Sequence, residues 1–65
     1  MIKKIFCDLT NESQQMELFR NSDNRCYIEI NTENEYVQII TLDSDDLTEF
    51  ISELKKIKKQ IDNHE

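Results

Sequence analysis

Residues 42–62 read LDSDDLTEFISELKKIKKQID and carry the strongest structural signal in this 65-residue chain. Apolar residues recur there at spacings of three, four and seven, which places them on one face of an α-helix. These residues are Leu47, Phe50, Ile51, Leu54, Ile57 and Ile61. We expect an amphipathic helix from about residue 44 to about residue 62, whose apolar stripe needs a second element to cover it.

The start of this helix is marked by the residues around it. Asp43 is a good N-cap, Asp46 falls at the third helical position, and Leu42 and Leu47 are spaced as a hydrophobic staple. Acidic residues fill the first turns and lysines the last, which complements the helix dipole.

Upstream of the helix, segments 2–9, 25–31 and 36–42 are rich in Ile, Val and aromatic residues and predict strands. The polar connection 32–35 has hairpin length, so the last two strands should pair antiparallel. Residues 16–20 alternate as a fourth strand, although residues 11–19 also fit a short helix. Asn21-Ser22-Asp23-Asn24 is a strong turn signal, and we favour the strand.

The sequence therefore predicts one α+β domain over residues 1–65. It is an antiparallel β-meander of three to four strands followed by one C-terminal amphipathic helix packed on one sheet face. Alternation along the first two of the three clear strand segments assigns six residues to the core-facing side. They are Ile5, Cys7, Leu9, Cys26, Ile28 and Ile30.

Apolar residues in the opposite phase form a candidate interaction surface. They are Phe6, Phe19, Tyr27, Val37 and Ile39. One helix cannot cover both sides of a sheet, and an exposed apolar patch on a small protein usually marks a binding surface. A homodimer through sheet faces is its simplest use. The alternative is a shifted strand phase, for instance at a bulge, in which case these residues complete the core.

The net charge of −6 is unevenly placed. Residues 1–54 hold twelve acidic and four basic residues, whereas residues 55–65 hold four lysines against two acidic residues. An acidic body disfavours binding to phosphate and favours a basic protein partner. The candidate basic patch of the helix end supports only a runner-up function in nucleic-acid binding. It comprises Lys55, Lys56, Lys58 and Lys59.

No motif indicates catalysis, a cofactor or a metal, and we expect a protein that is not an enzyme. The acidic run 43–46 with Glu49 resembles a cation site, but it lacks the loop of an EF-hand, and helix capping explains it. Cys7 and Cys26 are expected to be buried, reduced thiols. His64 has no partner in sequence and receives no role.

A cytoplasmic protein is the expectation, because Asp8 interrupts the N-terminal segment before a signal-peptide core can form. The junction 39–43 leading into Leu47 resembles that of many small phage and mobile-element proteins. We predict a small acidic protein-binding or regulatory module that binds itself or a basic host protein. The alternative is a nucleic-acid-binding dimer that uses its lysine-rich helix ends and its sheet aromatics.

Overall fold

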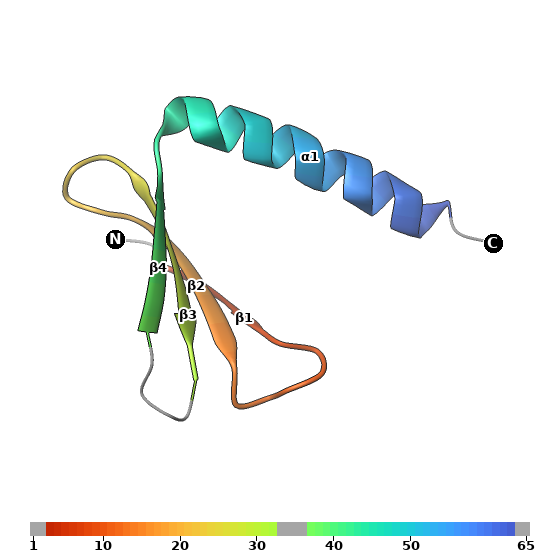
Figure 1. Ribbon diagram of the computed structural model, residues 1–65, viewed down its shortest axis with the longest axis horizontal. Coiled ribbons are helices and arrows are strands. Elements are labelled where there is room, and N and C mark those ends of the chain that lie inside the picture. Colours follow the sequence, from red (N-terminus) through yellow and green to blue (C-terminus); the bar gives the residue numbers. More distant parts are fainter. Residues whose placement is uncertain (1–2, 33–36, 64–65) are drawn as a thin grey trace.

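The computed structural model describes residues 3–32 and 37–63, and it confirms the α+β meander and the C-terminal helix (Figure 1). All neighbouring strands are antiparallel and follow one another in chain order across the sheet. The elements are β1 (Lys4–Cys7), β2 (Gln15–Arg20), β3 (Cys26–Asn31), β4 (Val37–Leu42) and α1 (Ser44–Asp62). The predicted hairpin connection at residues 33–35, with Tyr36 and His64, lies outside the described residues.

The segment that fitted both a strand and a short helix is a strand, β2. The turn that follows it is held by Asn21, whose side-chain oxygen accepts hydrogen bonds from the backbone N–H groups of Asp23 (3.0 Å) and Arg25 (2.9 Å). Asn24 has φ of 62°, in the left-handed region. The chain has no glycine, so an asparagine, the next most tolerant residue, takes this position.

A polar turn at Asp8 ends β1 earlier than the sequence predicted. The Asp8 carboxylate accepts hydrogen bonds from the backbone N–H (2.8 Å) and the hydroxyl (2.9 Å) of Thr10, and from the Gln14 amide (3.0 Å). The chain therefore leaves the sheet after Cys7. Leu9, predicted to face the core, lies in this turn and is 98% exposed.

The strand register divides the sheet into two faces, because directly paired residues point the same way. The Ile28 face carries Lys4, Phe6, Met16, Leu18, Arg20, Cys26, Ile28, Ile30, Gln38, Ile40 and Leu42. The Tyr27 face carries Ile5, Cys7, Gln15, Glu17, Phe19, Tyr27, Glu29, Asn31, Val37, Ile39 and Thr41.

The predicted phase of β1 was wrong relative to that of β3. Phe6 pairs with Met16, which pairs with Ile30, so Phe6 shares the face of Ile28, whereas Ile5 and Cys7 lie on the opposite face. A shift of one residue in register moves every side chain of a strand to the other face. The turn that begins at Asp8 sets this register, and the alternation within β1 alone does not reveal it.

The helix has the predicted bounds and the predicted capping box. The Asp43 carboxylate accepts a hydrogen bond from the Asp46 backbone N–H (2.8 Å), and the Asp46 carboxylate accepts one from the Asp43 N–H (3.4 Å). Asp43 is the only residue between β4 and α1. Connections from a strand to a helix that packs back on its own sheet usually contain two to six residues. Here the helix instead leaves the end of the sheet and projects away from it (Figure 1).

The resulting molecule is extended. Its accessible surface is 5939 Å², whereas a compact chain of 7.8 kDa exposes about 4,400 Å². Its radius of gyration is 13.7 Å, against about 10.7 Å for a compact domain of this length. Within residues 3–32 and 37–63, the only buried apolar side chain is Ile28, at 7% exposure.

Candidate protein-interaction surface

The Ile28 face is apolar across all four strands. Ile28 stands at its centre, paired with Leu18 on β2 and with Ile40 on β4. Branched and long aliphatic side chains suit this pleated surface, which explains both the strand formation and the apolar face. The charged residues on this face are both basic, Lys4 and Arg20, at the outer ends of β1 and β2. No acidic residue of the four strands lies on it.

The helix stripe, defined as Leu47, Phe50, Ile51, Leu54, Ile57 and Ile61, is uncovered along most of its length. Leu47 is half-buried, but the exposed fraction is 39% at Phe50, 49% at Ile57 and 68% at Ile61. No residue of α1 is buried. The single connecting residue at Asp43 accounts for this exposure, because it allows the helix too little chain to turn back over the sheet.

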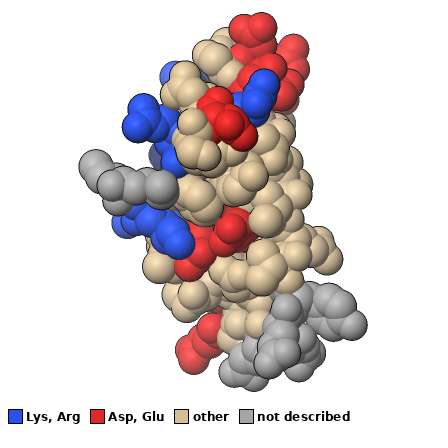
Figure 2. All heavy atoms as spheres, turned by 90° about the vertical axis from the view of Figure 1, so that its left-hand side faces the viewer, with Lys and Arg blue, Asp and Glu red and all other residues tan. Residues whose placement is uncertain are grey.

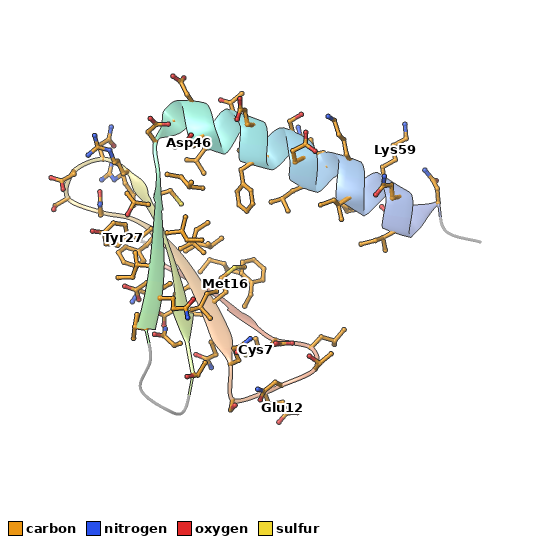
Figure 3. The ribbon with its side chains drawn as sticks, viewed as in Figure 1. Cys7, Glu12, Met16, Tyr27, Asp46 and Lys59 are labelled. Carbon is orange, nitrogen blue, oxygen red and sulfur yellow. The ribbon has the colours of Figure 1, made fainter. Side chains whose placement is uncertain are left out.

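The helix leaves the end of the sheet on its Ile28 side. In Figure 3, Met16 lies on the side over which the helix extends, and Tyr27 lies on the other side. At the corner where β4 meets the helix there is a hollow of about 480 Å³. Its apolar lining includes Leu47 of α1 and, from three strands of the sheet, Leu18, Cys26 and Leu42. The helix stripe and the Ile28 face are therefore adjoining parts of one surface.

Four of the five residues predicted as an interaction surface lie together on the Tyr27 face, and Phe6 lies on the other. Phe19 and Tyr27 form an edge-to-face pair with ring centroids 5.5 Å apart. Lys3 stands 5.0 Å above the Phe19 ring. Val37 and Ile39 are 54% and 49% exposed, so they do not complete a core in this chain.

Two carboxylates distinguish the Tyr27 face from the Ile28 face. Glu17 and Glu29 are direct cross-strand partners on β2 and β3, and like charges in this position are destabilising. The Lys3 ammonium lies 3.4 Å from the Glu17 carboxylate and offsets part of this repulsion. Figure 2 views the molecule from this side and shows acidic groups within a mainly uncharged surface, with most of the basic groups along the left edge and one at the upper right.

The lysines of the predicted basic patch lie in the last turns of α1, and two of them have acidic neighbours. The Lys56 ammonium lies 3.0 Å from the Glu53 carboxylate, and Lys58 pairs with Asp62. Both pairs are exposed and so contribute little to stability. They reduce the positive potential that a phosphate backbone would meet.

The candidate cation residues at the helix start take part in capping through Asp43 and Asp46. Within the part of the chain that the structure describes, no three His, Cys, Asp or Glu residues are grouped to hold a metal ion. The expected burial of both cysteines was wrong, since Cys7 is exposed and Cys26 is partly exposed. The pKa of Asp8 is lowered, first by the Thr10 backbone N–H and then by the Thr10 hydroxyl.

Sequence reasoning missed the exposure of the Ile28 face, because it assumed that the helix would cover this face. The signal that points to the open arrangement is the spacing at the junction. Leu42 ends a strand pattern and Ser44 begins a helix pattern, which leaves only Asp43 to turn the chain.

Fold and surface together define a small four-stranded meander with a projecting amphipathic helix and an open apolar surface. No protein-family model, curated protein or solved structure matches this chain. Among the described residues, no helix combines the length and the apolar character required to cross a bilayer.

Proposed function

We propose that this chain is a protein-interaction module that acts by binding another polypeptide and not by catalysis. The observation that carries the proposal is the open surface formed by the helix stripe and the Ile28 face. The excess accessible surface is about 1,500 Å² relative to a compact chain of the same mass. This excess includes polar atoms, and the apolar part of it comes from the exposed side chains of the helix stripe and from Ile40 and Phe6 on the Ile28 face.

The charge distribution supports a protein partner over a nucleic acid. The net charge is −6, and two of the four helix-end lysines are paired with carboxylates. An acidic molecule is repelled by a phosphate backbone, and lysines already paired with carboxylates release fewer counterions on binding it. Apolar anchors such as Phe50, surrounded by charged residues, are typical of protein interfaces.

Site-specific photo-crosslinking in cells that express the chain tests the proposal. A benzophenone amino acid replaces Phe50 or Ile57 in the helix stripe, and Ser52, on the opposite side of the helix, is the matched control position. We expect a protein adduct of the same mass from positions 50 and 57 and none from position 52. Absence of any protein adduct from positions 50 and 57 contradicts the proposed function.

A further inference from the structure

We infer that the partner of this surface is a second copy of the chain, and that α1 of each copy packs on the Ile28 face of the other. This inference rests on the proposed function and identifies the molecule that covers the surface. The surface has two complementary parts, an apolar helix side and an apolar sheet face, that one short connection holds apart. A second copy supplies the missing half of each contact, so a two-fold arrangement satisfies both at once.

The length of the connection favours this exchange between copies. Asp43 alone joins β4 to α1, and short hinge loops favour domain swapping because the chain cannot reverse within them. The contact between helix and sheet that the amphipathic pattern predicts within one chain then forms between two chains. Each helix has 19 residues and is about 28 Å long, whereas the outer strands of a four-stranded sheet lie about 14 Å apart. The helix is therefore long enough to cross the partner's sheet.

The available area agrees with a stable dimer. An excess of about 1,500 Å² per chain relative to a compact monomer corresponds to about 3,000 Å² for a pair, which lies within the range of obligate homodimers. An area below about 1,000 Å² would indicate a weak or incidental contact.

Charge complementarity also favours the second copy. The Ile28 face has only basic charges, on Lys4 and Arg20. The helix stripe is bordered on one side by Asp46 and by Glu53, which pairs with Lys56, and on the other side by Lys58, which pairs with Asp62. When the helix lies on the partner's sheet, the Asp46 carboxylate can approach a face whose own charges are positive, and the other charges beside the stripe are already paired. The Tyr27 face instead carries the carboxylates of Glu17 and Glu29, which would repel Asp46.

Sedimentation equilibrium on purified chains with matched substitutions tests the inference. Ile40 and Ile39 are neighbours on β4 with similar exposure, 57% and 49%, but they lie on opposite faces. We expect the wild-type chain and Ile39→Lys to have twice the mass of one chain. Ile40→Lys and Leu54→Lys should weaken the dimer about 30-fold or more, as expected for a central interface residue. Circular dichroism establishes that each variant is folded.

Mixing the two defective variants separates this arrangement from other dimers. One pairing in the mixed dimer joins an unaltered helix to an unaltered sheet, so Ile40→Lys and Leu54→Lys together should recover a dimer that neither forms alone. A dimer that Ile40→Lys leaves intact and Leu54→Lys abolishes indicates helix–helix pairing and overturns the inference. A dimer that only Ile39→Lys disrupts assigns the interface to the Tyr27 face and also overturns it.

The oligomeric state of the wild-type chain tests this inference separately from the proposed function. A monomeric wild-type chain overturns the inference, while the photo-crosslinking experiment still decides the proposed function. A crosslinked adduct with the mass of a different protein supports the function and rejects the second copy. No adduct, together with a radius of gyration near that of a compact monomer, contradicts both.

Discussion

Ile28 and Ile40 lie directly opposite each other on β3 and β4, yet Ile28 is 7% exposed and Ile40 is 57% exposed. The buried region of the single chain therefore ends between two paired residues of the same face. Neither side chain is polar, and no acidic residue of the four strands lies on their face. An apolar face that is exposed one residue from its centre is the feature on which the proposed partner contact depends.

Replacement of Ile28 tests how much stability this small core provides. Ile28→Ala should lower the free energy of unfolding by about 2–5 kcal/mol, because it removes methyl and methylene groups from a buried side chain and leaves a cavity. Ile39→Ala, on the Tyr27 face and half exposed, is the matched control and should cost less than about 1 kcal/mol. Urea unfolding monitored by circular dichroism measures both. Equal losses in the two variants would mean that the Ile28 face is not the core.

The length of the connection at Asp43 is predicted to decide whether the helix packs within or between chains. Insertion of Asn-Gly-Ser between Leu42 and Asp43 keeps the capping box and gives a strand-to-helix connection of ordinary length. We expect this variant to be a compact monomer, since the helix stripe can then reach its own sheet. Size-exclusion chromatography with light scattering measures its mass, and insertion of the same residues after Asp62 is the control. A dimer that persists with the longer connection would contradict the role given to Asp43.

The turn at Asp8 should make a small pH-dependent contribution to stability. Hydrogen bonds from Thr10 and Gln14 favour the charged carboxylate, so the pKa of Asp8 is lower in the folded chain than in the unfolded chain. This stabilisation is fully present above the unfolded pKa, about 3.9, and is lost as the pH falls through the folded pKa. Carboxyl chemical shifts measured by NMR across this range should show the lowered pKa.

Two substitutions identify the source of this shift. Thr10→Val removes the hydroxyl group but keeps the backbone N–H, so it should raise the pKa of Asp8 only part of the way toward its ordinary value. Ser13→Ala is the control, because the Ser13 hydroxyl donates a hydrogen bond to the Asn11 side-chain oxygen (2.7 Å) and not to Asp8. A Thr10→Val variant with an unchanged pKa would show that the hydroxyl has no part in the shift.

The opposed carboxylates of Glu17 and Glu29 should destabilise the sheet. Glu29→Gln removes the repulsion and keeps the side-chain size, so it should raise the free energy of unfolding by about 0.2–1 kcal/mol. The gain should shrink as salt is added, because salt screens exposed charges. Glu12→Gln, in an exposed turn, controls for the loss of one negative charge. A gain in Glu12→Gln as large as that in Glu29→Gln would assign the effect to net charge alone.

Local sequence patterns were sufficient to predict the helix and strands and to locate the start of the helix. The apolar spacing from Leu47 to Ile61 and the Asp43–Asp46 capping box are properties of neighbouring residues, and the structure has α1 at the predicted bounds. The turn at Asn21–Asn24 was likewise visible from residue types alone. These features depend on interactions within a few residues, which a sequence reports directly.

Register and packing depend on contacts that the sequence does not display. The face of Phe6 depends on how the turn that begins at Asp8 aligns β1 with β2, and a one-residue difference reverses it. For the same reason the predicted set of five interaction residues is divided between the two faces. The exposure of the helix stripe depends on the geometry of a one-residue connection. An amphipathic pattern indicates that an apolar stripe needs a covering surface, but it does not indicate whether that surface belongs to the same chain.

The most direct test of the central claim is an isotope-filtered NMR experiment on a mixture of labelled and unlabelled chains, which detects only contacts between different molecules. We predict intermolecular cross-peaks between methyl groups of Leu54 or Ile57 and methyl groups of Ile28 or Ile40. Cross-peaks between these methyl groups that appear only within single chains, with none in the filtered spectrum, would contradict this claim.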